Sequence, residues 1–148
     1  MEKNKIIILK NGIDVFGNKI EILINGEIIE KISQNIDESR FKNNENARII
    51  DTEGKLVMPG IIDVHTHMRD PGITYKEDFA TGSRACAKAG VTTFYDMPNT
   101  IPTTTTLENL LKKKKLASEK AIVNFGFHFG GSKNDNVEEI KKVLSSGE

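Results

Sequence analysis

Short hydrophobic runs alternate with turn signals along the first third of the chain. Residues 19–24 show a period of two, and Asn-Gly pairs at 11–12 and 25–26 separate β-branched runs, which favours hairpins. Strands are expected at residues 6–9, 20–24, 28–32, 47–51 and 55–58. Residues 1–58 are therefore predicted to form a small β-rich domain.

Beyond Pro59 the pattern changes to strand followed by helix. Apolar runs predict strands at residues 61–65, 91–96 and 121–127. Each strand is followed by a capping signal for a helix, at Thr74-x-x-Glu77, Thr105-x-x-Glu108 and Asp135-x-x-Glu138. Gly90 and Gly147 are expected to end the first and third helices. Strand–helix repetition indicates parallel strands with right-handed crossovers, so residues 59–148 are predicted to form an α/β domain.

Three such units are too few to close a barrel, which takes about 250 residues. Parallel strands covered by helices on one side would leave the other face of the sheet open to water. We therefore expect the chain to be the N-terminal part of a larger protein. The alternatives are a small three-layer domain, or an obligate oligomer that completes the sheet between subunits.

Composition narrows the class of protein. The chain has 148 residues, 37% of them hydrophobic and 28% charged, which is typical of a soluble globular protein. Its formal net charge is zero, so global electrostatics give no case for nucleic acid or an anionic membrane, and a small neutral or anionic metabolite fits better. The single cysteine, Cys86, excludes an intramolecular disulfide, and a cytoplasmic location is expected. The one charge run, residues 112–115, is interpreted as a solvated helix face.

Candidate chemistry gathers at the end of the first strand after Pro59. Strand alternation would place Asp63, His65, His67 and Arg69 on one side, so the two imidazoles would converge. Neutral imidazole is the commonest metal ligand, and the pair resembles half of a metal site. The third histidine, His128, follows the third strand and is expected to be a hydrogen-bonded, tautomer-fixed side chain rather than a ligand.

Four sequence blocks together carry a resemblance to a known family. They are Pro59-Gly-Ile-Ile-Asp-Val-His-Thr-His-Met-Arg-Asp-Pro-Gly72, Lys76-Glu-Asp-Phe79, Ala80-Thr-Gly-Ser83 and Met97-Pro-Asn-Thr100. In this order they resemble dihydroorotases of the amidohydrolase superfamily. The resemblance implies the N-terminal portion of a metal-dependent (β/α)8 barrel, comprising the first three βα units. Part of a small β-sandwich would precede it.

The resemblance also implies a zinc site at the C-terminal end of the barrel. His65 and His67 would ligate one of one or two zinc ions. Arg69 would bind the substrate carboxylate with its guanidinium, Asn99 through its amide N–H, and His67 would lie against the substrate as well. The remaining metal ligands, among them a carboxylated lysine or an aspartate, and the acid/base aspartate would lie beyond Glu148. No catalytic acid or base is therefore expected within this chain, which alone would be inactive.

The reaction implied by the resemblance is the reversible cyclisation of N-carbamoyl-L-aspartate to dihydroorotate in pyrimidine biosynthesis. One alternative is a related cyclic amidohydrolase, such as allantoinase or dihydropyrimidinase, although Arg69 and Asn99 suit a substrate that bears a carboxylate. The other is a non-catalytic relative that acts through interaction alone. Expected partners are the small-molecule substrate and either a second copy of the chain or aspartate carbamoyltransferase, with no nucleic acid and no membrane.

Overall fold

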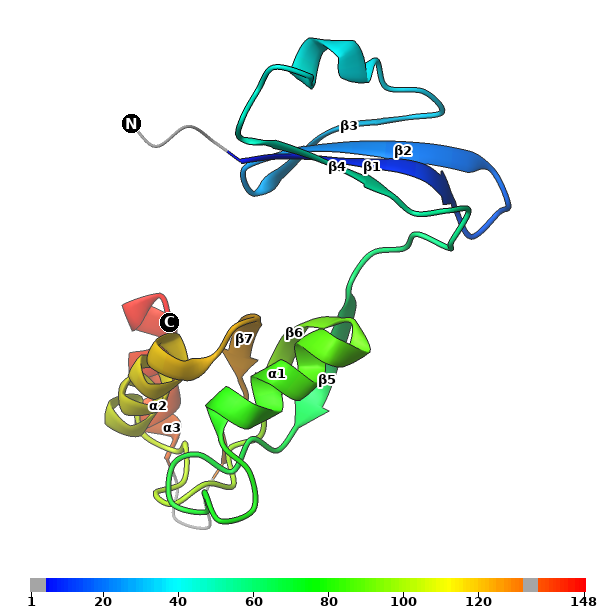
Figure 1. Cartoon of the computed structure of the whole chain (residues 1–148). Helices are drawn as coiled ribbons and strands as arrows, with labels where there is room; N and C mark the ends of the chain where they lie inside the picture. The colour runs from blue at the N-terminus through cyan, green and yellow to red at the C-terminus, as the bar shows by residue number, and fades with distance from the viewer. Residues whose placement is uncertain (1–4, 132–135) are drawn as a thin grey trace. The chain divides into compact units, whose positions relative to one another are not determined.

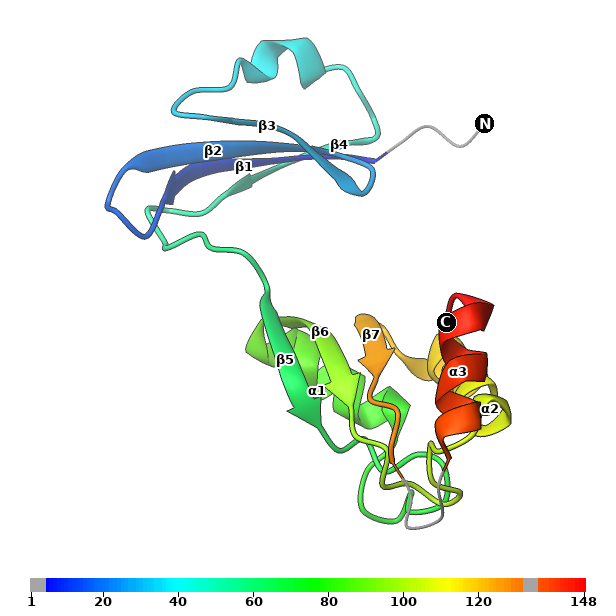
Figure 2. The same cartoon turned by 180° about the vertical axis from the view of Figure 1, so that it is seen from behind.

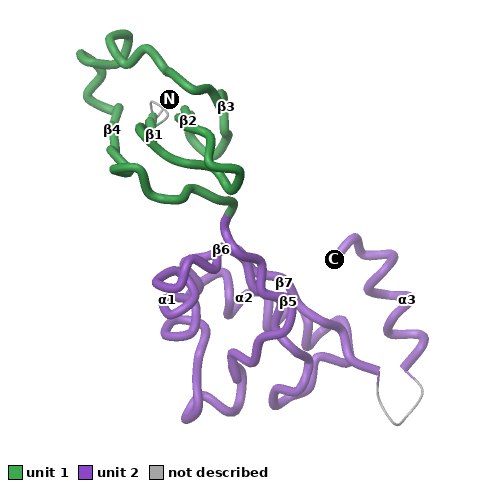
Figure 3. Tube along the Cα trace, turned by 90° about the vertical axis from the view of Figure 1, so that its right-hand side faces the viewer, with its two compact units in different colours: residues 1–59 green, residues 60–148 purple. Residues whose placement is uncertain are grey.

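The computed structural model describes residues 5–131 and 136–148. The chain divides into two compact units, Met1–Pro59 and Gly60–Glu148 (Figure 3). Each unit has its own sheet and its own hydrophobic core. Within the described residues, no helix is both long enough and apolar enough to cross a membrane.

The first unit is a four-stranded sheet in the order β3-β2-β1-β4 (Figure 1). Its strands are β1 (Ile6–Ile13), β2 (Lys19–Asn25), β3 (Ile28–Ser33) and β4 (Ala47–Asp51). β1 pairs antiparallel with β2, and β2 with β3, whereas β4 runs parallel to β1. The turn predicted at Asn25-Gly26 is confirmed, but the one predicted at Asn11-Gly12 was wrong. Both residues lie within β1, at an irregularity in its pairing with β2, and the chain turns at residues 14–18 instead. The strand expected at residues 55–58 was wrong. Leu56 forms only an isolated bridge to Ile13, because β1 ends at Ile13 and offers no further backbone to pair with.

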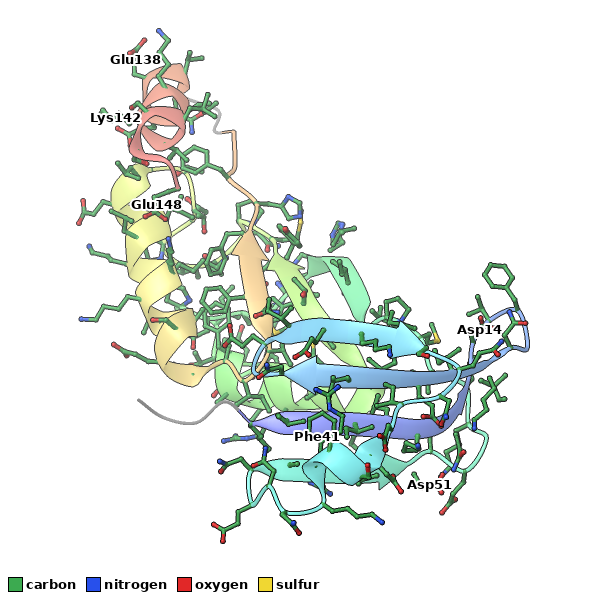
Figure 4. All side chains as sticks on the ribbon, turned by 90° about the horizontal axis from the view of Figure 1, so that it is seen from above. Asp14, Phe41, Asp51, Glu138, Lys142 and Glu148 are labelled. Carbon is green, nitrogen blue, oxygen red and sulfur yellow. The ribbon has the colours of Figure 1, made fainter. Side chains whose placement is uncertain are left out.

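The core of the first unit lies between the sheet and the segment that links β3 to β4. Ile8, Leu23 and Ile36 are buried together, and Phe41, labelled in Figure 4, packs against them from the 3-10 helix η1 (Glu38–Phe41). The buried carboxylate of Glu21 accepts a hydrogen bond from the Ile36 backbone N–H at 2.7 Å. It also pairs with the ammonium group of Lys10 at 3.0 Å.

The second unit alternates strands and helices around a three-stranded parallel sheet in the order β5-β6-β7. Its elements are β5 (Ile61–Thr66), α1 (Phe79–Ala89), β6 (Val91–Asp96), α2 (Leu107–Lys120), β7 (Asn124–Phe127) and α3 (Val137–Ser146). Helix α1 lies in front of β5 and β6 in Figure 1 and behind them in Figure 2, so it covers one face of the sheet. Met68, Phe79, Phe94 and Ala117 form the buried core beneath the helices.

The other face of this sheet carries apolar side chains that no described residue of the second unit covers. Ile62, Val64 and Tyr95 remain 59%, 62% and 40% exposed. Parallel sheets normally have both faces covered. The sequence predicted that three parallel strands with helices on one side would leave the other face open, and the structure agrees.

Helix starts differ from the predicted capping signals. Helix α1 begins after Asp78, whose carboxylate accepts a hydrogen bond from the Thr81 N–H at 2.8 Å, so the predicted start at Thr74 was wrong. An N-cap side chain accepts a hydrogen bond from a backbone N–H in the first turn that has no partner within the helix, and Asp78 does so here. Helix α2 has Thr106 as its cap, one residue later than predicted, and β7 begins at Asn124 rather than at residue 121. The predicted cap Asp135 lies outside the described residues.

Gly90 and Gly147 follow the last residues of α1 and α3, as predicted, and both adopt left-handed backbone conformations. Residues without a Cβ adopt this conformation at little cost, which is why glycine commonly ends helices.

Candidate metal and substrate site

The candidate residues lie where β5 and β6 end. His65 is on β5, and His67 and Arg69 follow that strand, which ends at Thr66. The pairing of β5 with β6 shifts register between Asp63 and Thr66, and Arg69 has a left-handed φ of 62°. Strand alternation therefore does not extend to Arg69, and the prediction that alternation directs its side chain was wrong.

The structure nevertheless brings the two imidazoles together. The ring centroids of His65 and His67 are 5.3 Å apart, and the planes are inclined by 61°. Two imidazoles on one tetrahedral zinc, with zinc–nitrogen bonds of about 2.0–2.1 Å, have centroids about 5 Å apart. The two rings thus fit the spacing that a shared metal ion requires.

His67 has a hydrogen-bond partner that selects its tautomer. Its Nδ1 lies 3.0 Å from Oδ1 of Asn99, in the loop after β6. A carboxamide oxygen can only accept, so Nδ1–H of His67 donates and Nε2 keeps a lone pair. Metal-ligating histidines usually donate their other ring N–H to a carbonyl or carboxylate in this way. The contact with Asn99 therefore leaves Nε2 as the ring nitrogen of His67 that carries a lone pair.

The described residues contain no cluster of three or more histidine, cysteine, aspartate or glutamate side chains that could hold a metal ion. His128 donates from Nε2 to the Val64 carbonyl at 2.7 Å, and its ring lies 6.0 Å from that of Tyr95. This hydrogen bond fixes the tautomer of His128, as expected from the sequence. His65 and His67 are thus a donor pair that fits a metal only when other ligands complete its coordination.

Arg69 is half-buried, and no carboxylate in the described part of the chain forms an ion pair with it. The two nearby acids suggested by the sequence have other partners: Asp70 pairs with Lys120 at 2.6 Å, and Glu77 accepts a hydrogen bond from the Thr81 hydroxyl. Neither of these acids therefore neutralises the guanidinium of Arg69.

One member of the 112–115 charge run is not solvated. The Lys113 side chain is only 1% exposed and pairs with Asp96 at 2.6 Å, so the interpretation of the whole run as a solvated face was wrong for this residue. Burial lowers the pKa of Lys113, and Asp96 opposes that shift. The signal was present in the sequence: Lys113 lies three residues after Leu110 and four before Ala117, on the buried face of α2.

Comparison with known proteins places these features in a family. Residues 56–147 match the amidohydrolase family, which is more than half of the chain. The chain belongs to the amidohydrolase family. The matched residues include His65 and His67 as well as Arg69 and Asn99.

Similar proteins include enzymes for several cyclic amides. The chain is 38% identical over 134 residues to a dihydroorotase of Methanosphaera stadtmanae. This match covers 90% of the chain and 30% of that relative. It is 42% identical over 102 residues to an allantoinase of Streptomyces avermitilis, covering 68% of the chain and 23% of the relative. Among solved structures, L-hydantoinase from Arthrobacter aurescens matches with a TM-score of 0.81 and 35% identity, covering 95% of this chain and 31% of that one. The matches thus cover between 23% and 31% of the length of these relatives.

Proposed function

We propose that this amidohydrolase chain contributes the first two metal ligands and the carboxylate-binding residues of a zinc-dependent dihydroorotase. The observation that carries the proposal is the hydrogen bond between His67 Nδ1 and Asn99 Oδ1 at 3.0 Å. It joins the segment after β5 to the loop after β6, and it leaves Nε2 of His67 available while the His65 ring lies 5.3 Å away, centroid to centroid.

Each residue has a distinct role in the proposed reaction, the reversible cyclisation of N-carbamoyl-L-aspartate. His65 and His67 would hold zinc, which when bound polarises an amide carbonyl and makes water a better nucleophile. Arg69 would bind the substrate carboxylate through paired, charge-assisted hydrogen bonds. Asn99 would donate its amide N–H to the same carboxylate while its oxygen orients His67.

The proposal extends to the architecture. We infer that the units β5-α1, β6-α2 and β7-α3 correspond to the first three βα units of a barrel, and that the four-stranded unit is part of the accompanying sandwich. The candidate residues then occupy the C-terminal ends of the strands, which is where (β/α)8 enzymes carry their active sites. The cytoplasm is the proposed location, and the substrates are the proposed partners.

A related cyclic amidohydrolase is the second candidate, because the relatives include an allantoinase and a hydantoinase. Arg69 distinguishes a dihydroorotase from a related cyclic amidohydrolase that acts on an uncharged substrate. A half-buried guanidinium without a carboxylate partner in the described residues favours an anionic substrate, since an unpaired charge is otherwise costly to bury. Dihydroorotate carries such a carboxylate.

A chimera tests the proposal. In it, this chain replaces the matching segment of the Methanosphaera stadtmanae dihydroorotase. We expect the zinc-loaded chimera to turn over dihydroorotate and not allantoin. We expect Arg69→Ala to lower kcat/KM about 10–100-fold with zinc content unchanged, because a hydrogen bond to a charged group is worth about 1.5–3 kcal/mol.

Arg84→Ala, an exposed arginine of α1, is the matched control and should behave like the parent. Turnover of allantoin by the chimera would favour the second candidate. Loss of zinc in Arg69→Ala would contradict the role assigned to Arg69.

A further inference from the structure

Asp96 and Lys113 form an ion pair that the proposed reaction does not use. Their side chains are 0% and 1% exposed, and Oδ2 of Asp96 lies 2.6 Å from Nζ of Lys113. A buried pair adds little net stability, because the loss of hydration offsets the attraction between the charges. The role of the Asp96–Lys113 pair is therefore indicated by the other groups that it contacts, and not by the stability that it adds.

Asp96 connects the ends of all three strands in the second unit. Its Oδ1 accepts from the Met68 N–H at 2.6 Å, and Met68 stands between His67 and Arg69. Its backbone carbonyl accepts from the His128 N–H at 2.9 Å, just after β7. Asp96 itself is the last residue of β6.

Lys113 connects the same point to the loop that carries Asn99. Its ammonium group donates to the Met97 carbonyl at 2.8 Å and lies 3.4 Å from the Thr104 hydroxyl oxygen. Thr104 closes that loop, since its N–H donates to the Pro98 carbonyl at 2.9 Å. The ammonium group thus has two hydrogen-bond acceptors and one ionic partner, all at this end of the sheet.

We propose that the Asp96–Lys113 pair is a positioning device that holds the His67–Arg69 loop and the Asn99 loop in register, so that His67 can donate to Asn99. Neither residue reaches the candidate ligands, so both act through the backbone. The inference rests on the proposed function for its catalytic consequence, although the contact between His67 and Asn99 can be observed without turnover.

The first test uses the 148-residue chain labelled with 15N-histidine. We expect the parent to show the Nδ1–H tautomer of His67, and Lys113→Met to lose that signal. The double variant Asp96→Asn/Lys113→Met should lose it too, and it leaves no unpaired buried charge, which protects folding. Lys10→Met, which breaks the buried pair with Glu21 in the first unit, is the matched control and should keep the signal.

The second test measures kcat/KM in the chimera. We expect Lys113→Met to lower it about 100-fold, which is the cost of misplacing a site by about 1 Å, and Lys10→Met to leave it near the parent value. A folded double variant that keeps the His67 signal would overturn the proposal, as would equal loss of the signal in Lys10→Met. An inactive parent chimera would contradict the proposed function alone, because the tautomer is observed in the chain itself.

Discussion

Replacing Asn99 by alanine removes the acceptor that fixes the tautomer of His67. The bond is 3.0 Å long, between a half-buried imidazole and an exposed carboxamide. Loss of such a partner typically weakens metal binding about 10–100-fold, or about 1.4–2.7 kcal/mol. Because Asn99 is exposed, water can replace part of the interaction, and we expect a loss near the lower end, about tenfold.

The assay is zinc competition against a chelating dye, with the chimera. Asn99→Asp is the informative second variant. A carboxylate accepts from Nδ1–H at least as well as an amide, so zinc affinity should persist, whereas turnover should fall because the new charge repels the substrate carboxylate. Asn43→Ala, an exposed asparagine of the first unit, controls for the substitution itself. Unchanged zinc affinity in Asn99→Ala would refute the orienting role of Asn99.

Two predictions concern stability. Phe79→Ala should lower the free energy of unfolding in urea by about 3–5 kcal/mol, because its ring is fully buried and lies 6.1 Å, centroid to centroid, from that of Phe94. Phe16→Ala, 85% exposed, should cost less than about 0.5 kcal/mol, and equal costs would contradict the assigned core. Burial raises the pKa of Glu21, but the Ile36 N–H and the Lys10 and Lys19 ammonium groups outweigh it and lower that pKa overall. The stability contributed by Glu21 is therefore present above its unfolded-state pKa and lost as pH falls through the folded value, so the stability difference between parent and Glu21→Gln should shrink in acid. A difference that grows in acid would contradict this sign.

The hydrophobic pattern predicted most of the elements because it reports which face of each element is buried. The turn at Gly26, the parallel strands after Pro59 and the left-handed helix ends at Gly90 and Gly147 are local features that short sequence windows encode. The Asn11-Gly12 pair carries the same turn signal but lies within β1. The start of α1 was less predictable, since Thr74 and Asp78 both precede suitable residues and only packing selects between them.

Contacts between loops could not be predicted from local sequence. Asn99 reaches His67 across 32 residues, and Lys113 reaches Asp96 across the interface between α2 and β6. Both contacts depend on how strand ends align, and β5 departs from regular register just before the site. The family resemblance named His65, His67, Arg69 and Asn99, but only the structure shows that His67 and Asn99 meet. It alone also shows that Lys113 is buried against Asp96 and the Met97 carbonyl.

The central claim, that His65 and His67 are ligands of one zinc ion, is tested most directly by zinc content in the chimera. We predict that His67→Ala loses zinc and dihydroorotase turnover together. His128→Ala, which removes a hydrogen bond to the Val64 carbonyl and a ring contact with Tyr95, should retain its zinc. Full zinc content and turnover in His67→Ala would contradict the account.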